Sequence, residues 1–272
     1  MKTKIHYIYI LVATVLLASC QNEQDPFDVS TNKGSFALSL QGPEINVQTD
    51  TRAVLTATEA ANYNIMVYQN NDEIWAQKKK YSDLTATDYM LSVGSGYAVF
   101  AESCSEADAE TVNDGFGCKR FAGTSDAFAI TPSQTTPVSV NCTATNGGFC
   151  VVFDKSFTDT FGRYSVETTD ENRLLVFNGT NKATFTTEGV RTGGAVAYYN
   201  MPPNTESIEV PIQIHARGAN TTDKTILVKQ GKITRFTVYG PNAGTGDNTG
   251  GIDIIIDYDD DYGTDDHPII LD

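Results

Sequence analysis

Hydrophobic and polar residues alternate along most of the chain with a period of two, which is typical of β-strands with one buried face. The clearest case is 208–214, where Ile208, Val210, Ile212 and Ile214 point to one face. Similar patterns predict further strands at 36–40, 63–68, 89–93, 97–101, 138–142, 149–153, 174–177, 195–199, 233–239 and 252–258. A helical turn or two is expected only at 156–161.

Turn-forming residues between these segments predict how some strands pair. Gly94-Ser95-Gly96 predicts a hairpin between 89–93 and 97–101. Asn146-Gly147 is typical of a type I′ turn and would join 138–142 to 149–153, pairing Cys142 with Val151. Pro211 cannot donate a ladder hydrogen bond, so 208–214 is predicted to be an edge strand.

Many short strands, with turn signals between them and no long helical stripe, predict an all-β fold of two tandem β-sandwich domains. A short internal repeat supports two domains, because Asn62-Tyr63-Asn64-Ile65 recurs as Arg163-Tyr164-Ser165-Val166. The repeat spans few residues, so coincidence is the alternative. We place the boundary so that 34–143 form the N-terminal sandwich and 144–272 the C-terminal sandwich, which ends in an acidic segment.

The N-terminus carries an export signal. Lys2 and Lys4 precede a short apolar run that ends at Ala18, which predicts a signal peptide over 1–19. Leu17-Ala18-Ser19-Cys20 resembles the lipobox of bacterial lipoproteins, and this resemblance implies cleavage before Cys20 and acylation of its sulfur. The polar residues 20–33 are then a lipidated tether to the membrane. The alternative is an ordinary signal peptide with an incidental cysteine.

The net charge of the chain limits which classes of partner it can bind. The chain has 34 acidic against 19 Lys and Arg residues, a net charge of −15, which becomes −17 once Lys2 and Lys4 leave with the signal peptide. Such a chain repels phosphate backbones, so we expect no nucleic-acid partner.

Four cysteines remain for disulfides after lipidation of Cys20. Cys104 and Cys118 flank an acidic loop, and closing it would remove roughly 3 kcal/mol of unfolded-chain entropy. Cys142 and Cys150 fall on opposite faces of the predicted hairpin, so a bridge between them needs a longer loop or a chain that leaves the sheet. No cysteine pair has zinc-knuckle spacing, and no cofactor is expected.

The order of segments resembles a known family. After the lipobox come Gly34-Ser35-Phe36-Ala37-Leu38-Ser39-Leu40, then 63–68, then 96–103, and finally the strand Ile252-Asp253-Ile254-Ile255-Ile256-Asp257. This is similar to the DUF4493 family of Bacteroides-type lipoproteins and, more loosely, to fimbrillins. The resemblance implies transthyretin-like sandwich domains and a place at the outer membrane or cell surface. It carries no catalytic residues over.

Signatures of catalysis are missing from the sequence. It has no G-x-S-x-G, H-E-x-x-H or P-loop motif, so we expect no enzyme. A glycosidase with paired carboxylates stays open, because such pairs meet only in three dimensions. Asp257, Asp259 and Asp261 could converge on calcium. However, Tyr262 replaces the EF-hand glycine, and a solvated acidic loop is the alternative.

Four further residues are candidates for processing or for ligand binding. In fimbrillins, cleavage after an arginine placed like Arg52 frees a groove for a neighbouring strand, so Arg52 is a candidate processing site; an ordinary loop arginine is the alternative. Trp75 and Tyr198-Tyr199 are the aromatic candidates for glycan binding, although strand aromatics more often pack in cores.

These observations predict a non-catalytic, lipid-anchored protein of the outer membrane or cell surface. Its expected role is structural or adhesin-like, with other envelope or pilus subunits as partners. The alternative is a glycan-binding accessory of an outer-membrane polysaccharide uptake system.

Overall fold

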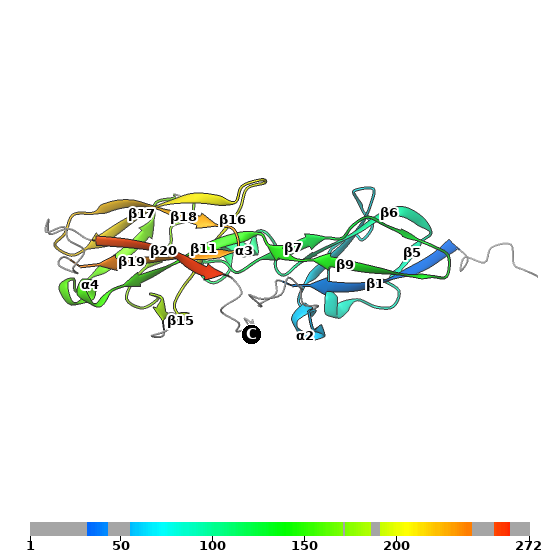
Figure 1. Cartoon of the computed structure of the whole chain (residues 1–272), viewed down its shortest axis with the longest axis horizontal. Helices are drawn as coiled ribbons and strands as arrows, with labels where there is room; N and C mark the ends of the chain where they lie inside the picture. The colour runs from blue at the N-terminus through cyan, green and yellow to red at the C-terminus, as the bar shows by residue number, and fades with distance from the viewer. Residues whose placement is uncertain (1–31, 43–54, 171, 186–190, 241–252, 262–272) are drawn as a thin grey trace, which may run out of the picture.

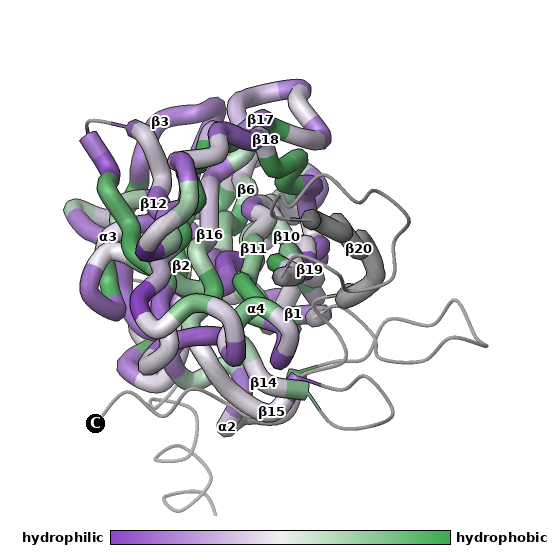
Figure 2. Tube along the Cα trace, turned by 90° about the vertical axis from the view of Figure 1, so that its left-hand side faces the viewer, coloured by the Kyte–Doolittle hydropathy of each residue, from purple (hydrophilic) through white to green (hydrophobic). Residues whose placement is uncertain are grey.

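The protein is an all-β molecule of two tandem β-sandwiches that lie end to end along its long axis (Figure 1). The computed structural model describes residues 32–42, 55–170, 172–185, 191–240 and the backbone of 253–261. Viewed along the long axis, hydrophobic stretches gather toward the middle and hydrophilic ones toward the outer turns (Figure 2).

The N-terminal sandwich has two sheets. The first has the strand order β5 (Met90–Ser92), β1 (Lys33–Gln41), β9 (Thr135–Asn141). The second has the order β10 (Thr143–Ala144), β7 (Phe121–Thr124), β6 (Gly94–Glu102), β2 (Asn64–Gln69), β3 (Asp72–Glu73), with β4 (Lys79–Lys80) on β2 and β8 (Phe128–Ile130) on β6.

The C-terminal sandwich also has two main sheets. One has the order β16 (Ala197–Asn200), β11 (Asn146–Phe153), β19 (Lys232–Tyr239), β20 (Asp253–Asp261). The other has the order β13 (Val176–Phe177), β12 (Tyr164–Thr168), β17 (Ser207–Ala216), β18 (Thr222–Lys229). A separate ribbon pairs β14 (Thr184–Phe185) with β15 (Arg191–Gly193).

Helices are short. They are α2 (Ala57–Ala60), α3 (Asp108–Thr111), α4 (Lys155–Thr160) and the 3₁₀ turn η2 (Tyr81–Asp83). The helical turn predicted at 156–161 is confirmed as α4. Asp154 begins it as an N-cap whose side chain accepts from the Ser156 N–H, which satisfies a free donor of the first turn.

The two sandwiches share a strand arrangement. β1 pairs in parallel with β9, and β11 pairs in parallel with β19. In each sandwich the next long strand, β2 or β12, belongs to the facing sheet. The residues of the short internal repeat fall at corresponding places, because Tyr63 precedes β2 and Tyr164 opens β12.

Each sandwich encloses its own hydrophobic core. In β17 the predicted alternation is confirmed, with Val210, Ile212 and Ile214 buried and Glu209 and Pro211 exposed. The N-terminal core is built mainly by Phe36, Leu38, Leu40, Ile65, Val67, Tyr97, Val99, Val138 and Val140. The C-terminal core is built mainly by Phe149, Val151, Phe153, Phe157, Phe177, Ile212, Ile214, Ile226, Phe236 and Val238.

The hairpin predicted between 89–93 and 97–101 is wrong. β5 pairs with β1, whereas β6 pairs with β2, β7 and β8, so the chain passes from one sheet to the other at Val93. The glycines open β6 instead of forming a turn. Gly96 has φ of +78°, and a Cβ there would lie 2.1 Å from Asn70 Oδ1, so both backbone conformation and close approach select glycine.

The Asn146-Gly147 hairpin is also wrong. β9 pairs with β1, and β11 pairs with β16 and β19 in the other sandwich, so this segment crosses between domains. A Cβ on Gly147 would lie 2.1 Å from the Lys229 carbonyl oxygen. The glycine is therefore needed for close backbone approach and not for a turn.

The prediction that 208–214 is an edge strand is wrong, because β17 lies between β12 and β18. The last residue of β12 paired with β17 is Thr168, opposite Ile212. The Pro211 carbonyl oxygen accepts from the Thr169 N–H at 3.1 Å, just past that strand end. The proline nitrogen faces the same side, where the ladder has already stopped, so its missing N–H is tolerated.

Candidate functional site at the interdomain junction

A single residue links the two sandwiches. β10 ends at Ala144 and β11 begins at Asn146, so only Thr145 lies between strands of different domains. Phe121 of β7 packs against the cores on both sides, and Ala144 packs against the cluster that contains Tyr198 and Ile233. The link is therefore short and is flanked by apolar contact.

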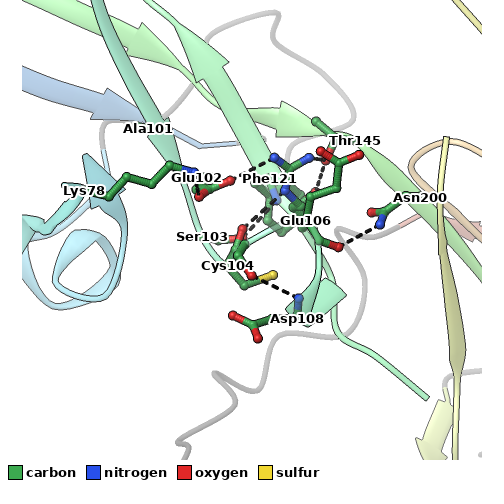
Figure 3. Close-up of polar contacts among 12 residues, drawn as sticks. Lys78, Ala101, Glu102, Ser103, Cys104, Glu106, Asp108, Phe121, Thr145 and Asn200 are labelled. Atoms are coloured by element: carbon green, nitrogen blue, oxygen red, sulfur yellow. Dashed lines mark hydrogen bonds and ion pairs between the residues drawn. The ribbon is translucent and has the colours of Figure 1, made fainter. Parts of the chain in front are cut away.

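A buried carboxylate lies beside this link. The side chain of Glu102, the last residue of β6, is 1% exposed. Its oxygens accept from Arg120 Nη2 at 2.8 Å and from Lys78 Nζ at 2.5 Å. Figure 3 shows Lys78 pointing toward Glu102. Two cations thus compensate a charge that would be costly to bury alone.

Arg120 ties three segments together. Besides Glu102, its Nη1 donates to Thr145 Oγ1 at 3.1 Å and its Nε donates to the Cys104 carbonyl at 3.3 Å. Its backbone carbonyl accepts from the Thr145 N–H at 2.9 Å. The fixed fork of guanidinium donors holds the end of β6, the cysteine loop and the interdomain link in one arrangement.

Asn146 begins the C-terminal sandwich and is fully buried. Its side-chain oxygen accepts from the Arg120 N–H at 2.9 Å, and its Nδ2 donates to the Cys118 carbonyl at 2.8 Å. Its backbone carbonyl accepts from the Gly231 N–H at 2.9 Å. Asn146 therefore joins the N-terminal sandwich to the β18–β19 turn.

The segment 104–118, which we call the clasp loop, leaves the N-terminal sandwich between β6 and β7 and lies on the C-terminal one. Asn200 at the end of β16 donates its N–H to Glu110 Oε1 at 2.7 Å and its Nδ2 to the Glu106 carbonyl at 2.8 Å. The Phe116 carbonyl accepts from the Tyr198 N–H at 2.8 Å. Figure 3 shows Asn200 reaching toward Glu106.

Arg173 of the C-terminal sandwich binds the tip of the clasp loop. Its Nε and Nη2 donate to the Gly115 carbonyl at 3.0 and 2.7 Å, and its Nη1 donates to the Tyr198 carbonyl at 2.5 Å. Its guanidinium carbon lies 4.3 Å from the Tyr199 ring centroid. Burial lowers the pKa of Arg173 and raises the pKa of Tyr199 to about 12, so at neutral pH a cation faces a neutral ring.

The structure brings one predicted cysteine pair together. Cys104 and Cys118 are free thiols whose Sγ atoms lie 2.9 Å apart at the base of the clasp loop. Cys142 and Cys150 are buried in different clusters, Cys142 in the N-terminal core and Cys150 beside Tyr198 and Ile233. Bridging them would require one thiol to leave its core.

The predicted aromatic residues do not form one site. Trp75 packs on the N-terminal core and lies under Lys79, whose Nζ is 5.4 Å from its ring centroid. Tyr198 and Tyr199 are in the C-terminal sandwich, where they are 6% and 8% exposed. Such burial gives them the packing role that the sequence left as the alternative.

Two predicted sites, Cys20 and Arg52, lie outside the described residues. Asp257, Asp259 and Asp261 lie in β20, so the acidic run extends the last strand and is not a loop after it; Asp257 is opposite Arg235. Only the backbone is described there. Among the side chains that the structure describes, no group of three or more His, Cys, Asp or Glu is arranged to hold a metal ion.

A shallow depression of about 400 Å³ lies in the C-terminal sandwich, lined by Arg163, Tyr164, Ser165, His215, Arg217 and Thr221 among others. Ile214 of β17 pairs with Thr222 of β18, so the loop between these strands lies opposite the junction turn at Gly231. The depression is therefore at the far tip of the molecule. No spacing in the sequence indicated it, because its residues come from two separate segments.

The junction residues were also missed by the sequence. By alternation Glu102 belongs to the face opposite Val99 and Ala101, so the pattern of β6 gives no signal that this side chain is buried. Its burial depends on Lys78 and Arg120, which are remote in the chain.

Across the described part of the chain, none of the helices has the length and hydropathy to cross a bilayer.

The fold and the junction define a class: a two-sandwich all-β protein whose domains are locked end to end by polar contacts. The chain belongs to a family described as a domain of unknown function, DUF4493, whose model matches residues 32–270. No curated protein matches the chain.

The chain is similar to several solved structures. A candidate adhesin from Bacteroides thetaiotaomicron has a TM-score of 0.45 at 12% identity, covering 77% of this chain and 91% of its own. The fimbrial anchor protein Mfa2 from Porphyromonas gingivalis has 0.44 at 12%, covering 82% and 97%. A fimbrial assembly protein from Parabacteroides distasonis has 0.42 at 12%, covering 83% and 95%. Similarity at this level does not transfer a function.

Proposed function

We propose that the protein is a lipid-anchored structural or adhesin-like component of the bacterial cell surface, a rigid spacer without catalytic activity that works with other envelope or pilus subunits. The observation that carries this proposal is the locked junction. A one-residue link, a buried ion pair and a docked loop leave the two sandwiches little freedom to move relative to each other.

The direction of the chain supports the same role. β1 runs parallel to β9, and β9 leads toward the link at Thr145, so Lys33 at the start of β1 lies at the end away from the junction (Figure 1). A tether attached before Lys33 would hold the N-terminal sandwich near the membrane and project the C-terminal sandwich outward.

Anchoring and display are tested with the full chain in cells. We expect palmitate label on the wild type and none on Cys20→Ala, and antibodies to the C-terminal sandwich should stain intact cells. Labelled Cys20→Ala protein, or staining only after lysis, would contradict anchoring through this cysteine or display at the surface.

Rigidity is tested by small-angle X-ray scattering of residues 21–272. One end-to-end arrangement should fit the wild-type curve. Arg173→Ala removes the donors that hold the clasp-loop tip and should broaden the distribution of sizes. Lys224→Ala changes an exposed residue of β18 and serves as a control. A wild-type curve that requires many interdomain orientations would rule out a rigid spacer.

Glycan binding is the second candidate function, and the depression at the far tip favours it. Arg163 and Arg217 have no carboxylate partner among the described side chains, while His215 lies 3.8 Å from Glu167. Uronic-acid oligosaccharides are suitable probes, because a guanidinium group can bind a carboxylate through two parallel hydrogen bonds. We would assign glycan binding to the depression at the far tip if Arg163→Ala and Arg217→Ala abolish binding of these oligosaccharides and Trp75→Ala does not.

A further inference from the structure

The two cysteines at the base of the clasp loop are placed for covalent closure. Cys104 lies two residues past β6, and Cys118 lies three residues before β7, so rigid strands hold both ends of the loop. Their Sγ atoms are 2.9 Å apart, and both residues are partly exposed. The approach needed to bond them is small, and a partner disulfide can reach them from solvent.

The surroundings make one of the two thiols reactive. A hydrogen bond from the Cys118 thiol, reinforced by Arg120, lowers the pKa of Cys104, whereas the same hydrogen bond and burial raise the pKa of Cys118. Cys104 is therefore the thiol that ionises first and attacks, and Cys118 is the resolving thiol.

The loop between these cysteines carries the interdomain contacts. Glu106 and Glu110 bind Asn200, and Gly115 and Phe116 bind Arg173 and Tyr198. The Phe116 ring lies edge-on to Phe177 of the C-terminal core, with centroids 5.2 Å apart. Any restraint on the base of the loop therefore acts on the junction.

We propose that Cys104 and Cys118 form a disulfide that closes the clasp loop and fixes the angle between the two sandwiches. The inference rests on the proposed spacer function and adds a covalent step to it. An exported protein meets the oxidising conditions that this bond requires.

The reaction is a thiol–disulfide exchange with an oxidised dithiol protein of the envelope. The Cys104 thiolate attacks one sulfur of that disulfide, forming a mixed disulfide and releasing a thiolate. Cys118 then loses its proton and attacks Cys104 Sγ, which releases the second thiolate. The clasp loses two electrons and two protons, and the oxidant gains them as two thiols.

Burial prevents the other two cysteines, Cys142 and Cys150, from taking part in this exchange. Cys142 and Cys150 are both 0% exposed, and burial raises the pKa of Cys142 to about 12. Neither sulfur can be reached by a partner disulfide from solvent. They serve as internal references for the test.

The first test maps disulfides in the full chain, extracted from the envelope in detergent with a thiol-blocking reagent. Under denaturing, non-reducing conditions we expect one cross-linked peptide pair containing Cys104 and Cys118, with Cys142 and Cys150 blocked by the reagent. Blocking reagent on all four cysteines, or any other pairing, would overturn the inference.

The second test measures amide hydrogen exchange at Tyr198 and Asn200, whose N–H groups donate to the clasp loop. Reducing the wild type should speed their exchange by about tenfold to a hundredfold, because the open loop regains its entropy. Reduced wild type is the main comparison because it carries no substitution; Cys104→Ser should match it, and Cys142→Ser should respond to reduction as the wild type does. Unchanged exchange on reduction would overturn the coupling to the junction.

These results separate the inference from the spacer function. A protein with free Cys104 and Cys118 and a single end-to-end arrangement in scattering is a spacer without the covalent clasp. A cross-linked protein with many interdomain orientations would contradict both the spacer and the role of the clasp.

Discussion

Replacing Arg120 with methionine should strongly destabilise the protein. The side chain of Glu102 is 1% exposed and that of Arg120 is 13% exposed, so the pair is buried. Removing one partner of such a pair typically costs 3–5 kcal/mol, because a buried charge is left behind. Lys78 remains 2.5 Å from Glu102 but is 41% exposed, so it compensates only in part. We therefore expect a loss of about 3 kcal/mol, the lower end of that range.

Urea unfolding at neutral pH, followed by circular dichroism, measures this loss. For a chain of this size the corresponding fall in Tm is about 6–12 °C. A matched control is Lys155→Met, which removes a cation from the pair with Asp159, where the charged atoms are 2.5 Å apart but the side chains are 83% and 60% exposed. That change should cost no more than about 0.5 kcal/mol.

The double variant Glu102→Gln with Arg120→Met separates charge from shape. If the penalty is an uncompensated carboxylate, removing that charge should restore about 1–2 kcal/mol relative to Arg120→Met alone. A loss below about 1 kcal/mol for Arg120→Met, or a double variant no more stable than the single one, would refute the account of Glu102 as a buried, partner-dependent charge.

Three further changes test the folding account. Asp154→Ala should lower the free energy of unfolding by about 1 kcal/mol, and Asp154→Asn should lower it much less. Hydrogen bonds from Ser156 lower the pKa of Asp154, so the charged side chain stabilises the folded state. The stability lost in the alanine variant should therefore be full above about pH 4 and should shrink as urea unfolding is repeated at lower pH. Ile212→Ala, at a site 1% exposed, should cost about 3 kcal/mol in urea unfolding. Gly147→Ala should lower the Tm clearly, because its Cβ would lie 2.1 Å from a backbone oxygen, whereas Gly162→Ala has nothing within 4 Å and should not.

The local pattern predicted strands well because burial and alternation are properties of neighbouring residues. Four alternating apolar residues predict β17, and the helical turn predicted at 156–161 corresponds to α4. Pairing was predicted poorly. Both expected hairpins assumed that consecutive strands pair, whereas β1 pairs with β9 over a separation of about a hundred residues. At both predicted hairpins the chain moves to a different sheet between the two strands, and a short turn signal does not show this.

Glycine shows why the turn signals misled. Gly147 is selected by a carbonyl from Lys229, and Gly96 by the side chain of Asn70. Both requirements arise in the folded structure from remote residues. A glycine that avoids a clash and a glycine that makes a turn look identical in one sequence.

The candidate site was predictable only in its covalent part. Cys104 and Cys118 were paired from their spacing around one loop, and the structure brings them together. Glu102 and Arg173 carry no such signal, because their partners are remote in the chain: Glu102 pairs with Lys78 and Arg120, and Arg173 bonds to Gly115. Burial of Glu102 even contradicts the alternation of its own strand.

The polar chemistry of the junction suits a spacer better than an apolar interface would. Apolar contact is non-directional, so Phe121 and Ala144 could hold the sandwiches together in several rotations. Guanidinium and amide groups bond only in particular directions, and a misplaced Arg120 would leave Glu102 buried with too little compensation. Each rotated arrangement therefore loses hydrogen bonds that water cannot easily replace. The polar contacts therefore select a single orientation of the two sandwiches at the junction, and an end-to-end spacer needs a single orientation.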